Sequence, residues 1–354
     1  MRPDLPLVQD LVLIGGGHTH ALVLRKWGMN PLAGVRVTVI NPGPTAPYSG
    51  MLPGFVAGHY GRDDLDIDLV QLARFAGARV INGKAIAIDR AAREIMVQGR
   101  PPIAYDIASL DVGITSEMPK LSGFAEHGIP AKPLGAFAAR WDAFRETTDD
   151  PSVAVIGGGV AGAELAMGMA HALRARGHDP KVTLIDRSYI LDGFGDTARR
   201  LMVDALTAQG VALIENTGVE CVMADGAVLS DGRTIAAAFV TGAAGARPHD
   251  WIVATGLDLH DGFVTVGADL RSSDPAIFAV GDCAHMAHAP RPKAGVYAVR
   301  QAPVLFDNIR AAMSGGDLRD YHPQRDYLKI VSLGAKQALA EKFGTARRGA
   351  LLWR

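Results

Sequence analysis

The sequence that decides the fold is LVLIGGGHTH at residues 11–20, and it returns as VAVIGGGVAG at residues 153–162. Each copy is an apolar run of strand length, three glycines, and then a segment with helical spacing. A strand, a glycine turn and a helix in this order place backbone N–H groups and the positive helix end against a dinucleotide pyrophosphate. We call these segments the first and the second cradle. Their pairing predicts two bound nucleotides.

Length, charge and cysteine content limit the alternatives. The 354 residues are too many for one ordinary core and fit two or three domains. There are 36 Lys and Arg and 37 Asp and Glu residues, so the net charge of −1 provides no basic surface for nucleic acid. The presence of only two cysteines argues against a disulfide framework and fits a reducing compartment, and residues 1–6 lack a signal-peptide pattern, so we expect a cytoplasmic protein. The apolar stretch 153–173 has the length of a membrane span, but three consecutive glycines and Glu164 within it favour a strand, a turn and a helix, so we expect no transmembrane segment.

Apolar runs separated by turn residues extend the cradles into an α/β fold. Strands are expected at 35–40, 107–112, 182–185, 239–243 and 276–280, a β-meander at 79–97, a loop at 45–60, a strand and hairpin at 211–229, helices at 134–145, 197–209 and 295–313, and a strand pair at 327–343. Two crossovers divide the chain. We expect a first domain of residues 1–117 and 247–316, a second of residues 118–246, and a C-terminal region of residues 317–354.

Four landmarks occur in an order that resembles a known superfamily: the two cradles, the strand ending at Thr241-Gly242, and the strand that runs into Gly281-Asp282. The chain resembles the pyridine nucleotide-disulfide oxidoreductases, flavoproteins that include glutathione reductase, type II NADH dehydrogenases and sulfide:quinone oxidoreductases. PYSGMLPG at 47–54 and PKAGVYAVRQ at 292–301 resemble, with GGGHTH, the oxidoreductase found alone or fused ahead of selenophosphate synthetase. The resemblance implies two Rossmann-like domains, the first split by insertion of the second.

The same resemblance implies where the cofactors bind. FAD would occupy the first cradle and NAD(P)H the second, and the Asp282 carboxylate, after Gly281, would bind the ribityl chain of the flavin. The glycines that would approach the phosphates are Gly15 and Gly17 in the first cradle, and Gly157, Gly159 and Gly162 in the second.

Several positions depart from this pattern or refine it. His20 stands where a third small residue is expected, so its side chain either displaces the helix or points at the phosphates. Neither His18 nor His20 has a third partner at metal-ligand spacing, so phosphate contact or helix packing is favoured over a metal site. Asn41 stands where an acid usually holds the adenosine ribose. In the second cradle Asp186 supplies that acid, which favours NADH over NADPH, and Arg187 weakens the preference.

Hydride transfer from nicotinamide to flavin needs alignment more than protein acids or bases. Lys293, just before the helix at 295, is expected to place positive charge near the flavin N1 and C2 carbonyl, or else to be a solvated loop lysine. Glu164 matches a position that faces the nicotinamide pocket in relatives, with a simple helix-surface charge as the alternative. Tyr48 lies either near the isoalloxazine ring or in ordinary loop packing.

The cysteines and the tail indicate where the electrons go. Residues 45–60 lack the cysteine pair of disulfide reductases, and structural thiols are favoured over sulfide chemistry at Cys221 and Cys283. The tail at 328–354 resembles in outline the C-terminal region through which type II NADH dehydrogenases reach quinone and membrane. Its arginines flank residues 351–353 as in an interfacial anchor, while a dimer contact or a frayed end explains them equally well.

These observations predict an FAD-dependent NADH dehydrogenase that passes electrons to a quinone-like acceptor. The alternatives are a flavin oxidoreductase linked to sulfide or selenium, and a flavoprotein that senses redox state without turnover. The protein is expected in the cytoplasm, and a peripheral contact with the inner face of the membrane and a homodimer stay open.

Overall fold

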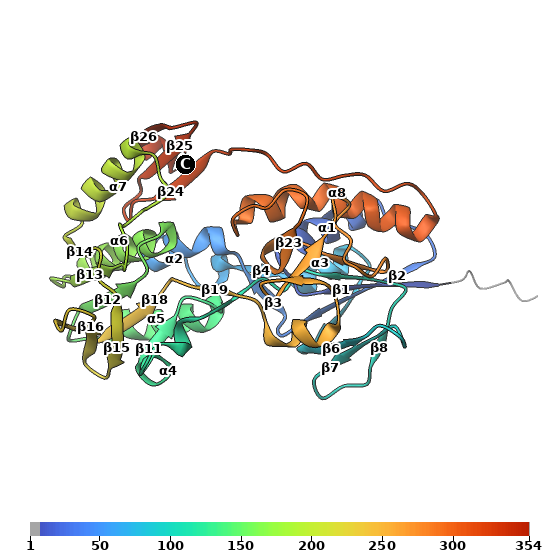
Figure 1. The fold of residues 1–354 in the computed structure, drawn as a ribbon, viewed down its shortest axis with the longest axis horizontal. Coiled ribbons are helices and arrows are strands. Elements are labelled where there is room, and N and C mark those ends of the chain that lie inside the picture. The colour runs from blue at the N-terminus through green and yellow to red at the C-terminus, as the bar shows by residue number, and fades with distance from the viewer. Residues whose placement is uncertain (1–7, 354) are drawn as a thin grey trace, which may run out of the picture. The chain divides into compact units, whose positions relative to one another are not determined.

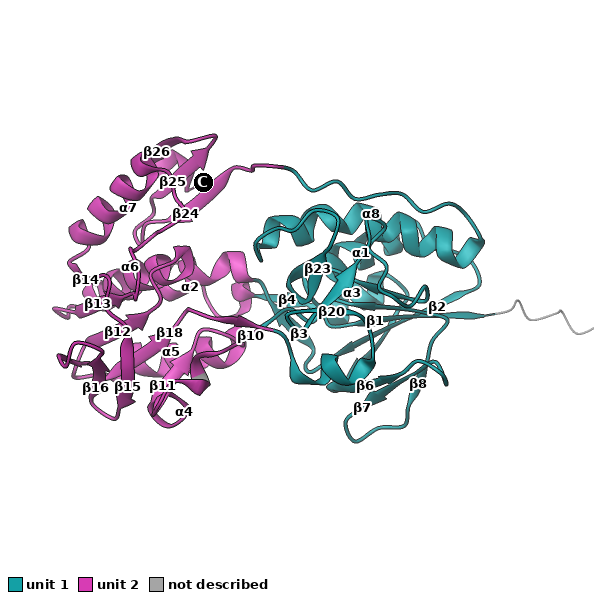
Figure 2. Cartoon of the chain, in the orientation of Figure 1, with its two compact units in different colours: residues 1–48, 66–114, 248–324 teal, residues 49–65, 115–247, 325–354 magenta. Residues whose placement is uncertain are grey.

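The computed structural model describes residues 8–353, which form two compact units (Figure 2). Unit 1 contains residues up to 48, 66–114 and 248–324, and unit 2 contains 49–65, 115–247 and 325 onward. The expectations for residues 1–6 and for Arg354 lie outside the described residues. The two units differ from the expected boundaries mainly because residues 49–65 and the C-terminal tail pack with unit 2.

Unit 1 is built on a five-stranded parallel sheet in the order β22-β9-β1-β2-β5. Its strands are β1 (Gln9–Ile14), β2 (Val35–Asn41), β5 (Arg79–Asn82), β9 (Ile107–Leu110) and β22 (Ile277–Ala279). Its α-helices are α1 (His18–Met29), α3 (Leu69–Phe75) and α8 (Gly295–Ser314), and α1 lies beside α8 (Figure 1). Residues 11–14 of β1 and all of β9 are buried, as expected for the central strands of a parallel sheet covered on both faces.

Unit 2 repeats this plan with a parallel sheet in the order β11-β18-β12-β13-β14. Its strands are β11 (Gly128–Pro130), β12 (Ser152–Ile156), β13 (Lys181–Ile185), β14 (Val211–Ile214) and β18 (Phe239–Gly242). Its α-helices are α2 (Leu52–Val56), α4 (Phe124–His127), α5 (Leu134–Thr147), α6 (Val160–Ala175) and α7 (Asp196–Ala208). β1 and β12 therefore hold the same place in the two sheets, with α1 and α6 directly after them.

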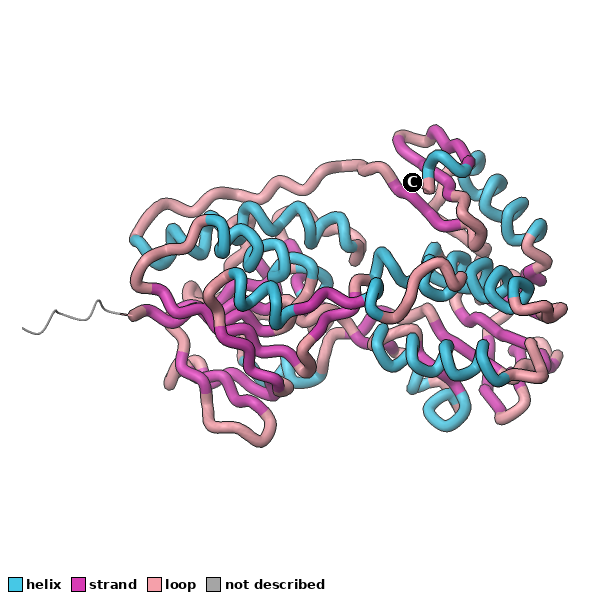
Figure 3. The backbone as a smooth tube through the Cα atoms, turned by 180° about the vertical axis from the view of Figure 1, so that it is seen from behind, coloured by secondary structure: helices cyan, strands magenta, loops and turns pink. Residues whose placement is uncertain are grey.

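Smaller elements complete each unit (Figure 3). Unit 1 has β3 (Thr45–Pro47), β4 (Asp66–Asp68), β6 (Ala85–Asp89), β7 (Glu94–Val97), β8 (Ile103–Ala104), β20 (Leu259–His260), β21 (Phe263–Val266), β23 (Ala284–Met286), and 3-10 helices at Asp250–Thr255 and Gly281–Cys283. Unit 2 has β10 (Thr115–Ser116), β15 (Val219–Met223), β16 (Gly226–Leu229), β17 (Thr234–Ala236), β19 (Ala246–Arg247), β24 (Lys329–Ser332), β25 (Ala338–Lys342), β26 (Thr345–Gly349), and 3-10 helices at Ser49–Met51, Asp63–Leu65, Met118–Lys120 and Ala350–Leu352.

Three sequence expectations are corrected. Residues 79–82 form β5 of the parallel sheet, and the antiparallel segment consists of β6, β7 and β8 instead of a meander beginning at residue 79. The tail forms three antiparallel strands, β24 to β26, where a pair was expected, because residues 345–349 pair with β25. The expected loop at 45–60 contains β3 and α2. Strand pairing explains β5, β26 and β3, which pair with β2, β25 and β4 respectively.

Candidate functional site

The two glycine turns have the same backbone geometry. Gly15 has φ +91° and Gly157 has φ +108°, a region that residues with a side chain adopt only with strain. Each of these glycines donates its N–H across the sheet at 2.8 Å, to the carbonyl of Ile40 and of Ile185 respectively. The turn is thus held at the carboxyl end of two parallel strands, which is where open α/β sheets bind ligands.

The second cradle leaves room for a phosphate group. A Cβ placed on Gly159, just before α6, would meet no atom within 4 Å. A Cβ on Gly162 would lie 1.8 Å from the carbonyl oxygen of Gly157, so a glycine there lets the helix pack against the turn. The open backbone at Gly159, together with the N-terminus of a 16-residue helix, fits a dinucleotide pyrophosphate.

Asn41 is the last residue of β2 and Asp186 follows β13 directly, so both lie at the carboxyl end of the strand that pairs with the cradle strand. Asp186 accepts a hydrogen bond from the N–H of Gly158 at 2.5 Å, and Asn41 Oδ1 accepts from the N–H of Gly16 at 3.0 Å. Burial alone would raise the pKa of Asp186, but hydrogen bonds from Ser188 and Gly158 lower it below its ordinary value. The second cradle therefore has a carboxylate at this position, whereas the first has a neutral amide.

The structure shows where the side chain of His20 lies, at the position where the sequence pattern expects a small residue. Its side chain is fully buried, with Nδ1 2.7 Å from the carbonyl oxygen of Gly15 and Nε2 2.8 Å from Ser109 Oγ. A carbonyl oxygen only accepts, so Nδ1 donates to it and Nε2 accepts from the serine hydroxyl. Burial lowers the pKa of His20 to about 4, so the ring is neutral at physiological pH. The ring thus packs between helix and sheet and is enclosed by protein.

Asp111 is a site residue that the sequence analysis missed. It follows β9 directly, is 4% exposed, and accepts a hydrogen bond from the N–H of His20 at 3.0 Å. A Cβ added to Gly17 would lie 2.3 Å from Asp111 Oδ1, and one added to Gly281 would lie 2.5 Å from the same atom. Its carboxylate therefore lies between two predicted cofactor-binding residues. The available signal was a charged residue at the carboxyl end of an apolar strand, in IASLD.

Gly281, Asp282 and Lys293 come together at the same end of this sheet. The N–H of Gly281 donates to Gln301 Oε1 of α8 at 2.7 Å. Lys293 Nζ donates to the carbonyl oxygen of Ala284 at 2.6 Å and lies 3.9 Å from the centre of the Phe263 ring. Burial lowers the pKa of Lys293, whereas the charges of Cys283 and Asp282 oppose that change. Lys293 is therefore a half-buried, positioned cation and not a solvated loop lysine.

His18 and Tyr48 meet edge to face at the start of α1. Their ring centroids are 4.7 Å apart with an interplanar angle of 70°. His18 Nδ1 also lies 3.4 Å from a Cβ built on Gly295, the first residue of α8. All the predicted flavin-site residues belong to unit 1: Gly15, Gly17, His18, His20, Asn41, Tyr48, Gly281, Asp282 and Lys293.

Unit 2 contains Glu164 together with Asp186 and the glycines of the second cradle. Glu164 lies in α6, and its Oε1 accepts a hydrogen bond from the N–H of Ser332 in β24 at 2.7 Å. Burial raises the pKa of Glu164 to about 7, and the bond from Ser332 partly opposes the rise. The carboxyl group is therefore shielded and lies near the midpoint of its titration at neutral pH.

The cysteines and the surface complete the description. Cys283 is buried, its Sγ lies 3.2 Å from the carbonyl oxygen of Val280, and burial with the nearby Asp111 carboxylate raises its pKa to about 12.

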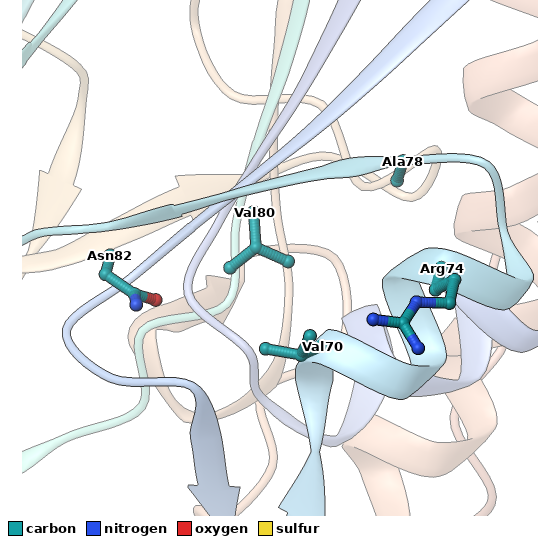
Figure 4. Close-up of a pocket in the computed structure, with 5 residues that line it drawn as sticks. All are labelled: Val70, Arg74, Ala78, Val80 and Asn82. Carbon is teal, nitrogen blue, oxygen red and sulfur yellow. The ribbon is translucent and has the colours of Figure 1, made fainter.

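A groove of 390 Å³ between α3 and β5 is lined by Val70, Arg74, Ala78, Val80 and Asn82, none of them a predicted site residue (Figure 4). Within residues 8–353, no helix has the length and hydropathy of a membrane span. The same residues contain no group of three acidic, His or Cys side chains arranged for a metal.

Comparisons with known proteins identify the family of the chain. The family model for pyridine nucleotide-disulphide oxidoreductases matches residues 9–302. The chain belongs to this family. Members bind FAD and a pyridine nucleotide, so the protein is a flavoprotein oxidoreductase whose cofactors are FAD and NAD(H).

Two curated relatives and one solved structure illustrate the similarity. An NADH dehydrogenase-like protein of Bacillus subtilis is 25% identical over 338 residues, which cover 93% of this oxidoreductase and 91% of that protein. A nitric oxide reductase FlRd-NAD(+) reductase of Aeromonas hydrophila is 33% identical over 56% of this chain and 50% of its own. The structure of NDH2 of Plasmodium falciparum in complex with NADH has a TM-score of 0.84 at 11% identity, with 98% and 93% of the two chains covered. At that identity it shows the shared fold alone.

Proposed function

We propose that this oxidoreductase is an NADH dehydrogenase that passes two electrons through FAD to a quinone-like acceptor. The observation that supports it best is the difference between its two cradles. Unit 2 presents an open glycine backbone at Gly159 beside the Asp186 carboxylate, which suits the ribose of NADH and repels a 2′-phosphate. Unit 1, with Asn41 and the Gly281-Asp282 turn, is then the FAD-binding unit.

Residues of this chain would bind and orient the two cofactors and would set the charge around them. FAD, when bound, supplies the acceptor for the hydride of NADH. Asp282 would hold the ribityl chain, Lys293 would place positive charge at the pyrimidine end of the ring, and Tyr48 would pack against the ring system. Glu164, with a pKa of about 7, would present a carboxyl group able to hold or release a proton on the nicotinamide side.

An external acceptor follows from the state of the thiols. A thiol with a pKa near 12 is a poor nucleophile, because the thiolate is the reactive form. Cys283 therefore suits packing better than a sulfide or selenium reaction.

Three apolar side chains of the C-terminal tail are largely exposed: Ile330 at 56%, Phe343 at 75% and Leu351 at 82%. Arg347 lies in β26 of the small sheet in this tail. This combination supports a peripheral contact with an anionic lipid surface. Trp353, by contrast, packs against His59 and Tyr60 and is not a free anchor.

Stopped-flow absorbance tests the proposal. Mixing the purified flavoprotein with NADH should bleach the flavin within one turnover, and a water-soluble quinone should restore the colour. NADPH should bleach it more slowly. Rapid bleaching without any response to quinone would remove the acceptor and leave the dehydrogenase half-reaction intact.

The Cys283→Ser variant separates the sulfur alternative from this proposal. Serine is close in size, so the buried site is preserved and NADH:quinone activity should stay near that of the wild type. Loss of turnover in the folded, flavin-loaded variant would favour sulfur chemistry instead. A protein that binds FAD and NADH but turns over with no acceptor would favour a redox sensor.

A further inference from the structure

The Asp111 carboxylate lies where the first cradle should receive an anion. It is nearly fully buried, it touches the positions of both Gly17 and Gly281, and it accepts the N–H of His20 in the first turn of α1. An N–H group at the N-terminus of this 12-residue helix is thus already bound by a negative charge of the protein itself.

The second cradle shows that the fold does not require this carboxylate. β9 and β18 hold the same place in their sheets, with Leu110 paired to Ile14 and Gly242 paired to Ile156. The residue that follows is Asp111 in unit 1 and Ala243 in unit 2. Correspondingly, a Cβ on Gly159 would meet open space. Of the two cradles, only the first therefore has a carboxylate at this position.

An ionised Asp111 and a pyrophosphate in one cradle would repel each other. The titratable and charged groups around Asp111 are His18 and His20 on α1, and Asp282 and Cys283 after β22. His18 attracts the carboxylate, Asp282 repels it, and His20 is neutral at physiological pH. Burial raises the pKa of Asp111 to about 6, so protonation of its carboxylate near neutral pH costs little free energy.

We propose that Asp111 takes up one proton when the flavin pyrophosphate binds, so that FAD binding by the first cradle is linked to pH. The inference rests on the proposed place of FAD in unit 1. One proton passes from solvent to the Asp111 carboxylate for each FAD bound, and no other bond changes. The neutral carboxyl group keeps an oxygen for the N–H of His20 and adds a donor beside the phosphates.

The test is FAD affinity as a function of pH, measured by flavin fluorescence on the full chain stripped of flavin. At pH values at least one unit below its pKa of about 6, where Asp111 is mostly protonated, the Kd should be constant. Above it, the Kd of the wild type should rise by up to about tenfold for each pH unit. Asp111→Asn should bind FAD more tightly than the wild type at about pH 8, with a Kd independent of pH, because the carboxamide oxygen still accepts from His20.

Two further measurements separate the outcomes. His18→Gln removes the other group whose charge favours an anion, and it should keep the pH dependence; if it abolishes that dependence while Asp111→Asn retains it, the inference is wrong. Calorimetry of the wild type in buffers of different ionisation enthalpy should show uptake of about one proton per FAD at about pH 8. Tight FAD binding without proton uptake would overturn the proposed role of Asp111 and leave the proposed function intact. Failure to bind FAD at all would overturn the proposed function.

Discussion

His20 and Gly162 occupy the same position in the two cradles, yet only one has a side chain. In unit 2 a Cβ at this position would lie 1.8 Å from the carbonyl oxygen of Gly157. In unit 1 the equivalent carbonyl, that of Gly15, receives a hydrogen bond from the imidazole. In unit 1 the buried side chain at this position is thus accommodated with partners for both ring nitrogens, the carbonyl oxygen of Gly15 and the hydroxyl of Ser109.

We predict that His20→Ala lowers the free energy of unfolding by about 2–4 kcal/mol at neutral pH. The substitution leaves a cavity and removes the partner of the buried Ser109 hydroxyl. The cost should shrink by about 2 kcal/mol at about pH 5. A folded pKa of about 4 lies below the ordinary value of 6.5, so the unfolded chain binds the proton first. The stabilising contribution of the neutral His20 ring is therefore complete above about pH 6.5 and is lost as the pH falls toward 4. Urea unfolding at the two pH values measures it.

The exposed His322 provides the control. His322→Ala should change stability by less than about 0.5 kcal/mol at either pH. A His20→Ala cost that is the same at both pH values would mean that the imidazole titrates normally in the folded protein.

The contact between α6 and β24 ties the C-terminal tail to the second cradle's helix within unit 2. β24, β25 and β26 form a sheet that packs beside α6 and α7, with Val331 and Leu339 buried (Figures 1 and 3). The hydrogen bond from Ser332 to Glu164 crosses this contact. A residue predicted for the nicotinamide pocket therefore also has a structural partner in the tail.

We predict that Glu164→Gln makes the protein more stable than the wild type at about pH 9, by about 1–3 kcal/mol, and equal to it near pH 4. The folded pKa of about 7 lies above the ordinary value of 4.5, so the neutral carboxyl is favoured by folding and stability is lost as the pH rises through 7. Glutamine is neutral throughout and still accepts from Ser332. Denaturant unfolding across this range, with the exposed Glu126→Gln as the control, checks it. A stability difference that does not vary with pH would show that Glu164 is solvated.

At the scale of the whole molecule, each unit has its own hydrophobic core. The core of unit 1 is formed by β1, β2, β9 and α8, and residues of unit 2 form two separate clusters around β12 and β18. Neither unit is continuous in the chain, so each core closes only after segments far apart in sequence have met. Chains with separate cores commonly depart from two-state unfolding.

We predict that FAD and NADH stabilise different parts of the molecule. In differential scanning calorimetry, FAD at about 100 times its Kd should add about 2.7 kcal/mol to unit 1, and NADH in similar excess should add as much to unit 2. At alkaline pH and at the same FAD concentration for both proteins, Asp111→Asn should increase only the FAD effect, because its Kd is lower. Identical shifts of a single transition by both ligands would contradict separate binding units.

The repeated strand, glycine turn and helix were readable in the sequence, because hydrophobic periodicity and glycines with positive φ are properties of neighbouring residues. The same holds for Gly281-Asp282, whose order in the chain pointed to the family. Only the tertiary structure revealed that Asp111 lies against Gly17, that Ser109 bonds to His20, and that residues 49–65 pack with unit 2. These contacts join residues distant in the chain, so their geometry, burial and altered pKa values arise only when the parallel strands come together.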